Sequence, residues 1–242
     1  MKDSSKYAKK VMKLFSSLKK ASQAPKEPEY EDPIDSIVHG ILSEYITLKD
    51  AKSAQRKIES HFVDLNDLRV SRTEEIVEVL GINKEVGAKI AAEVTNFLNI
   101  VFDRYDAISL DVLQDLGKRQ ARKDLEDLGC ISKFAVGYCF LTALKGHAIP
   151  LTEPMVNYLQ ENELVYPGAD SDTIEGFLER QISSSDGYTF YYLLREESEK
   201  SPGKSSTAAK TTTTKKKTTV KKAPAAKTTA AKKKTTRKKT AK

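Results

Sequence analysis

The segment at residues 124–145, DLEDLGCISKFAVGYCFLTALK, most constrains what this chain can fold into, because two helical patterns meet there at a very short turn. Leu125 and Leu128 lie on one face of the first pattern, and Gly129 can end that helix. Ser132 is a favourable N-cap for the second helix, which is apolar on most sides. A helix that apolar is usually buried at the centre of a domain, so we expect an all-α fold built around it.

The turn itself has a chemical consequence. A connection as short as Cys130-Ile131 leaves the unpaired backbone N–H groups at the start of the second helix pointing outward, where they attract a phosphate. Basic side chains surround the turn and can supply a local positive patch. The residues that we expect to contact nucleic acid here are Gly129, Cys130, Ile131, Ser132, Lys133, Lys118, Arg119, Arg122 and Lys123.

This segment resembles the helix-hairpin-helix of DNA glycosylases of the endonuclease III and MutY class. The family hairpin usually reads leucine, proline, glycine, apolar, glycine, basic, lysine, threonine, alanine, and residues 127–135 here read DLGCISKFA. Gly129 keeps the first glycine, Ile131 replaces the second, and Lys133 matches the lysine that forms a Schiff base in bifunctional members. The order of helices from about Pro33 to Glu197 extends the resemblance. It implies an all-α, endonuclease III-like domain that binds double-stranded DNA in base excision repair.

The resemblance also implies where a catalytic acid would lie. The family aspartate follows the second hairpin helix, and its place here falls in residues 149–154, IPLTEP, at Leu151 or Thr152. Glu153 is the acid that a register shift would bring there. Lys133 and Glu153 are therefore the predicted catalytic pair. Alternatively, Lys133 contacts a phosphate and Glu153 complements the helix dipole.

Two functions follow from these residues. A DNA-binding protein with reduced or lost catalysis is the first, because no acid stands at the family position. An active glycosylase or abasic-site lyase that uses Lys133 is the alternative. No cysteine follows Cys139, so the four-cysteine iron–sulfur loop of many family members is not expected, and neither is any other cofactor or metal.

Tyr45 is a further candidate for contact with DNA, and the sequence also predicts several connectors and caps. By resemblance, Glu44, Tyr45 or Ile46 falls where family members insert a side chain into the duplex. Tyr45 either stacks between bases or lies on the apolar face of its own helix. We expect a connector at residues 63–70 and helix caps at Ser71, Ser109 and Ser171-Asp172.

Four segments are predicted. Residues 1–22 form a basic amphipathic helix that packs on the domain or contacts nucleic acid, and residues 23–31 form a linker. Residues 32–199 form the helical domain, which begins with Asp32 as N-cap and Pro33 at the first helical position. Residues 200–242 form a Lys-, Thr- and Ala-rich tail that is expected to be disordered, since it has almost no large apolar residues to bury.

The net charge of this tail is opposite in sign to that of the rest of the chain. Of its 41 Lys and Arg residues, 16 lie in residues 200–242, which contain no Asp or Glu; residues 1–199 carry the other 25 against all 34 acids, a net charge of −9. In composition the tail resembles the C-terminal tail of linker histones. It is predicted to bind phosphates without sequence preference, through lysines that include Lys215, Lys216, Lys217, Lys232, Lys233 and Lys234.

The apolar runs and the two cysteines indicate which classes of protein this chain can belong to. No apolar run is long enough to span a membrane, and Cys130 and Cys139 suggest reduced thiols. We therefore expect a monomeric, intracellular, DNA-associated protein. If the tail dominates, a nucleoid or chromatin architectural role is a further alternative.

Overall fold

Helix α8, Lys133–Thr142, forms the centre of the core. In the computed structural model, which describes residues 4–200, every residue of α8 after the first is buried. It packs along α2, Pro33–Tyr45, and Gly40 permits the close approach, since a Cβ there would lie 3.1 Å from the Ala135 Cα. Residues 4–200 contain helices and no β-strand, which confirms the all-α prediction.

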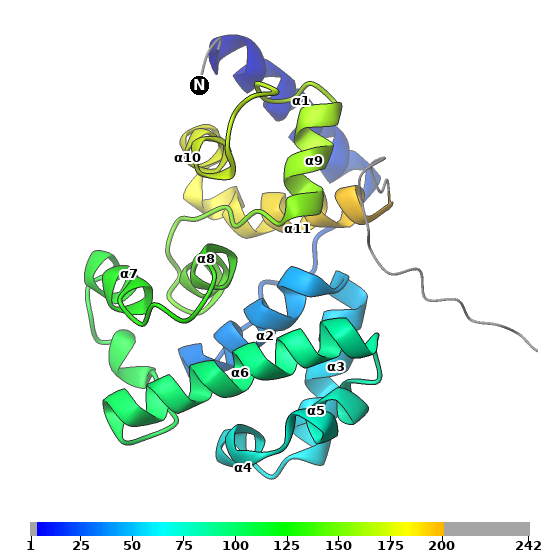
Figure 1. The fold of residues 1–242 in the computed structure, drawn as a ribbon. Coiled ribbons are helices and arrows are strands. Elements are labelled where there is room, and N and C mark those ends of the chain that lie inside the picture. The colour runs from blue at the N-terminus through cyan, green and yellow to red at the C-terminus, as the bar shows by residue number, and fades with distance from the viewer. Residues whose placement is uncertain (1–3, 201–242) are drawn as a thin grey trace, which may run out of the picture. The chain divides into compact units, whose positions relative to one another are not determined.

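Two groups of helices lie on either side of α8 (Figure 1). The first group contains α2, α3 (Leu48–His61), α4 (Leu65–Val70), α5 (Thr73–Leu80) and α6 (Lys84–Tyr105). A 3-10 turn, Asp111–Leu113, and α7 (Lys118–Glu126) lead from α6 into α8. The second group contains α1 (Ser4–Ala21), α9 (Glu153–Glu161), α10 (Ser171–Gln181) and α11 (Gly187–Lys200), with a second 3-10 turn, Ser184–Asp186, before α11.

The N-terminal helix α1 packs on α10 and α11 by its apolar face. Val11, Phe15 and Leu18 are buried, and the Phe15 ring meets the Phe190 ring edge-on at 5.2 Å between centroids. The packed-helix interpretation is thus confirmed. Its exposed lysines are Lys6, Lys9, Lys13, Lys19 and Lys20.

Some predicted connectors and caps are wrong. The stretch 63–70 contains a helix, α4, because the Asp64 side chain accepts a hydrogen bond from Asp67 N at 2.8 Å and Leu68 is buried. Ser71 does not cap the next helix. It ends α4 and donates from Oγ to the Asp67 carbonyl, while Arg72 precedes α5 without a side-chain cap.

Two further caps also differ from prediction. Ser109 Oγ accepts from Asp111 N at 3.2 Å and donates to Asp32 Oδ2 at 2.5 Å, but the element that follows is a 3-10 turn and not the expected α-helix. Asp170 caps α10 by accepting from Thr173 N at 2.7 Å, in place of Ser171-Asp172. For α10, the residue before the expected serine supplies the capping carboxylate.

Arg195 of α11 fixes the turn between α2 and α3. It is 3% exposed, and its Nη2 donates to the carbonyl oxygens of Ser43 at 2.5 Å and Ile46 at 2.9 Å. Its Nε donates to Glu199 Oε1 at 2.6 Å, and Glu199 in turn accepts from Leu48 N at 3.0 Å. One buried ion pair therefore ties the last helix to the turn that follows Tyr45.

Residues 4–200 include no helix that is both long and apolar enough to cross a bilayer. The predictions for residues 201–242, the tail lysines among them, concern residues outside the described part of the chain.

Candidate functional site

The α7–α8 turn forms a sharp backbone corner at the surface. Gly129 ends the first arm with φ +67°, a backbone conformation that residues with a side chain rarely adopt. A Cβ there would meet nothing within 4 Å. Ser132 begins the second arm, and its Oγ accepts from Ala135 N at 3.1 Å. Gly129 and Lys133 are exposed, while Cys130, Ile131 and Ser132 are half-buried. The predicted corner is therefore present.

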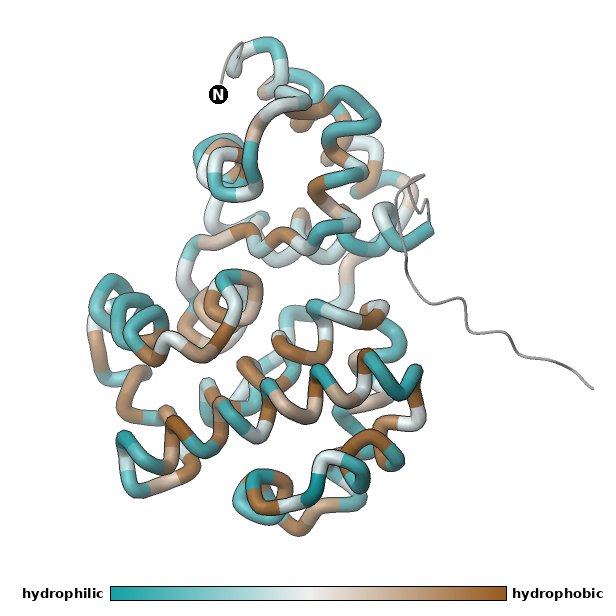
Figure 2. The backbone as a smooth tube through the Cα atoms, in the orientation of Figure 1, coloured by the Kyte–Doolittle hydropathy of each residue, from teal (hydrophilic) through white to brown (hydrophobic). Residues whose placement is uncertain are grey.

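Figure 2 shows the contrast between the two arms: α7 is largely hydrophilic, whereas α8 is mostly apolar. Lys118, Arg119 and Lys123 are exposed on α7, and Arg122 is half-buried, with its Nε 3.1 Å from Glu126 Oε1. Lys118 also donates to the Lys145 carbonyl oxygen. The structure thus places the predicted basic residues along α7, which leads to the corner, with Lys118 at the end of the helix away from it.

An acid also lies beside the corner. The Ser132 hydroxyl donates to Glu44 at the end of α2. Burial raises the pKa of the Glu44 carboxyl above its ordinary value, although the bond from Ser132 acts in the opposite direction. Glu44 therefore connects the hairpin to the end of α2.

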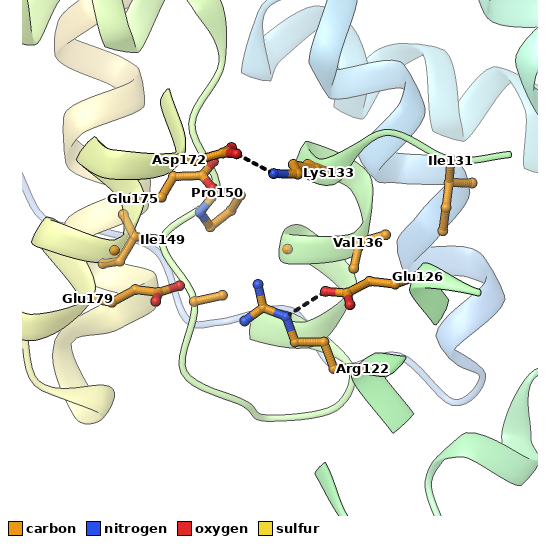
Figure 3. A pocket seen from close by; sticks show the side chains of 13 residues that line it. Arg122, Glu126, Ile131, Lys133, Val136, Ile149, Pro150, Asp172, Glu175 and Glu179 are labelled. Atoms are coloured by element: carbon orange, nitrogen blue, oxygen red, sulfur yellow. Dashed lines mark hydrogen bonds and ion pairs between the residues drawn. The ribbon is translucent and has the colours of Figure 1, made fainter. Parts of the chain in front are cut away.

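A cleft of about 500 Å³ lies between the hairpin and α10 (Figure 3). Side chains of the hairpin lie on one side and carboxylates of α10 on the other. The intervening wall is the segment 148–150. The lining residues are Arg122, Glu126, Ile131, Lys133, Val136, Gly137, Ala148, Ile149, Pro150, Asp172, Glu175, Gly176 and Glu179.

Lys133 is ion-paired across the mouth of this cleft. Its Nζ lies 2.6 Å from Asp172 Oδ2, and both side chains are largely exposed. The hydrogen bond to Asp172 raises the pKa of the Lys133 ammonium above its ordinary value. Lys133 is therefore held in its charged form.

Among the carboxyl groups that line the cleft, that of Glu175 has the most altered pKa. Burial raises its pKa to about 7, with smaller contributions from the Asp172 and Glu179 carboxylates. Its Oε1 accepts from Leu151 N at 3.3 Å, which opposes the rise, as does the charge of Lys133. Glu175 thus changes protonation near neutral pH, as acid–base groups in enzymes do.

The helix order and hairpin match several solved structures. A trapped endonuclease III–DNA covalent intermediate has a TM-score of 0.60 at 10% identity, covering 78% of this chain and 84% of that one. The Clostridium acetobutylicum 8-oxoguanine glycosylase/lyase, in complex with double-stranded DNA, has a TM-score of 0.61 at 13% identity, covering 82% and 71%. The H. pylori 3-methyladenine DNA glycosylase has a TM-score of 0.58 at 13% identity, covering 78% and 97%.

This is the helix-hairpin-helix DNA glycosylase fold. At these identities the likeness shows the fold alone. No protein-family model matches the chain, and no curated protein matches it by sequence.

Within this glycosylase fold, Glu153 lies apart from the cleft lining. It is exposed at the start of α9, and the carboxylate that meets Lys133 is instead Asp172. Leu151 and Thr152, at the place predicted for the family acid, are both buried. The structure therefore does not bring the predicted pair, Lys133 and Glu153, together in the cleft lining.

Tyr45 is half-buried at the end of α2 and engaged by α6. Its hydroxyl donates to Glu93 Oε1 at 2.6 Å, and Lys89 Nζ lies 4.4 Å from the ring centroid. Burial raises the pKa of its hydroxyl. Insertion into a duplex stays a prediction, and it would require these contacts to open.

Sequence reasoning missed the three acids of α10. Asp172, Glu175 and Glu179 follow the i, i+3, i+7 spacing that places side chains on one helix face. The spacing of these acids predicts an acidic helix face, but it does not indicate that this face lies opposite Lys133. Residues 4–200 contain no group of three or more His, Cys, Asp or Glu side chains arranged to hold a metal ion.

Proposed function

We propose that this protein binds double-stranded DNA through the α7–α8 corner and that its base-excision chemistry is reduced or lost. The exposed turn at Gly129 and the basic face of α7 support contact with phosphates. Solved structures with the same fold include complexes with DNA, and these motivate the proposed partner.

The ion pair between Lys133 and Asp172 carries the proposal of reduced catalysis. A lysine must lose its proton before it can attack a sugar aldehyde and form a Schiff base. Here the amine lies 2.6 Å from a carboxylate, which favours the charged form. A protonated Lys133 can still contact a phosphate.

Borohydride trapping on DNA with an abasic site tests this part of the proposal. We expect the native chain to give no more covalent adduct than Lys133→Ala. An adduct that forms readily and disappears in Lys133→Ala would contradict it and would establish a lyase.

Paired substitutions on α7 and α3 test the DNA-binding surface. The double variant Arg119→Ala/Lys123→Ala should bind a duplex more weakly, with a salt slope smaller by about one to two, because each lost phosphate contact reduces the slope by about 0.9. Lys52→Ala/Arg56→Ala removes the same charge from exposed positions of α3 and should leave the slope unchanged. Equal effects of the two variants in anisotropy titrations would contradict a hairpin surface.

A further inference from the structure

We propose that the outer face of α1 is a second phosphate-binding surface, which contacts the backbone of duplex DNA independently of the α7–α8 corner. This surface is separate from the one proposed above and shares with it only the partner, double-stranded DNA. We call it the lysine stripe. Its residues are Lys6, Lys9, Lys13 and Lys20.

The packing of α1 directs the lysine stripe to solvent. Val11, Phe15 and Leu18 are buried against the rest of the domain. Since successive helical residues are rotated by about 100°, the four stripe lysines lie on the side of α1 opposite these three. All four are exposed. A rise of about 1.5 Å per residue places the two ends of the stripe about 21 Å apart, so it follows most of the helix.

The two other lysines of α1 are ion-paired with the domain, whereas the stripe is not. Lys10 Nζ lies 3.4 Å from Glu163 Oε2. Lys19 Nζ lies 2.5 Å from Asp186 Oδ1. Within residues 4–200, none of the stripe lysines forms an ion pair. Their ammonium groups are therefore available to an anion from outside this part of the chain.

The stripe is positive although the domain that carries it is acidic. Helix α1 contains six lysines and no Asp or Glu, while residues 22–199 contain 18 Lys and Arg against 33 Asp and Glu. The exposed surface of α3, by contrast, carries both signs, with Asp50 and Glu59 among its basic residues. A helix face of a single sign attracts a partner of the opposite charge, here a polyanion.

The buried apolar face of α1 favours nucleic acid over an anionic membrane. A helix that binds in a bilayer interface places its apolar face among the lipid chains. In α1 that face is packed inside the domain, and Met12, at 45%, is its exposed large apolar side chain. Lysines bind the phosphates of a duplex without any apolar insertion, so a duplex is the polyanion that fits.

The stripe and the corner are separate surfaces. Helix α1 packs on α10 and α11, and it contributes no residue to the cleft between the hairpin and α10. Figure 1 shows α1 at the top of the view and α7 at the lower left. Charge changes on the stripe therefore leave the side chains of the corner in place, and each surface can be tested by itself.

Lysine acetylation of the full chain, with and without a saturating duplex at low salt, tests the proposal directly. Only the uncharged amine reacts, and a phosphate beside it favours the charged form. With duplex bound, we expect the stripe lysines to react at least about threefold more slowly. Lys49 and Lys52, exposed on α3, should react at an unchanged rate. Mass spectrometry of peptides gives the rate at each lysine, and Lys123 reports on the corner in the same sample.

Unchanged acetylation of the stripe lysines in the presence of bound duplex would overturn the proposal. If Lys123 is protected in that experiment, the proposed function survives without the stripe. Protection of the stripe with Lys123 unchanged would support the stripe and contradict the corner. Protection of the stripe by phosphatidylserine vesicles, and not by duplex, would also overturn the proposal.

Paired substitutions give a second measurement. Lys13→Ala/Lys20→Ala removes two stripe charges, and Lys52→Ala/Arg56→Ala removes the same charge from exposed positions of α3. In anisotropy titrations the stripe variant should bind at least about threefold more weakly, with a salt slope smaller by about one to two, and the α3 variant should match the native chain. Equal effects of the two variants, both melting cooperatively at the native temperature, would overturn the proposal.

Discussion

Lys133 Nζ lies 2.6 Å from Asp172 Oδ2, and this ion pair joins the hairpin to α10 across the mouth of the cleft. The two residues are 39 positions apart in the sequence. The pair has two consequences: it keeps Lys133 charged, and it places a carboxylate close to the surface where we propose that phosphates bind.

Asp172→Asn should increase affinity for duplex DNA several-fold. The substitution removes a negative charge near the corner and frees Lys133 to pair with a phosphate. Glu161→Gln, at an exposed position of α9, removes the same charge elsewhere and serves as the control. Anisotropy titrations at two salt concentrations measure both. An affinity gain no larger than that of Glu161→Gln would refute the role given to this pair.

Glu175→Gln should stabilise the fold at pH 8 and have little effect near pH 4. The Glu175 carboxyl has an ordinary pKa of 4.5 and a folded pKa of about 7, so its ionised form is disfavoured in the folded state. The penalty is absent below the unfolded pKa, grows as pH rises from about 4.5 to 7, and is complete above that. Allowing for its partial exposure, we expect a gain on the order of 1–2 kcal/mol at pH 8.

Urea unfolding of both proteins at pH 4, 6 and 8 measures this difference. A gain that is equal at all three pH values would show that packing, and not ionisation, is responsible.

Arg195→Met should destabilise the fold by about 3 kcal/mol, because it leaves Glu199 and two carbonyl oxygens without their buried donor. Lys200→Ala removes the exposed partner of Glu196 in the same helix and should change stability by less than about 0.5 kcal/mol. Denaturant midpoints compare the two variants. Similar small losses in both would mean that the buried pair does not hold the α2–α3 turn.

Much of the fold follows from local sequence. Gly129 and Ser132 mark the two ends of the hairpin turn, and the apolar sequence of α8 indicates its burial, because caps and helix faces are local properties. Helix α4 was missed although Asp64 is a good N-cap, since a six-residue helix has too few positions to show a period.

The acids of the site could not be placed in this way. The prediction of Glu153 rests on its nearness in sequence to the family position, whereas Asp172 and Glu175 reach the cleft from α10 through packing of distant helices. A spacing rule finds residues that share one helix. It cannot say which other helix they face.

Removal of residues 204–242 should greatly weaken binding to any duplex and flatten its salt dependence. This segment contains 15 of the chain's 41 Lys and Arg residues and no Asp or Glu, and each lysine on a phosphate releases counterions. Anisotropy titrations at salt concentrations from about 50 to about 200 mM measure both the affinity and its salt dependence. An unchanged affinity and slope would exclude a role for the tail lysines.

Hydrogen–deuterium exchange of the full chain, with and without a short duplex, tests the central claim most directly. If the corner binds the phosphate backbone, amides of residues 126–135 should exchange more slowly when DNA is bound, while amides of α3 and α5 should not change. If DNA binds and exchange at residues 126–135 is unaltered, the corner is not the binding surface and the proposed function is contradicted.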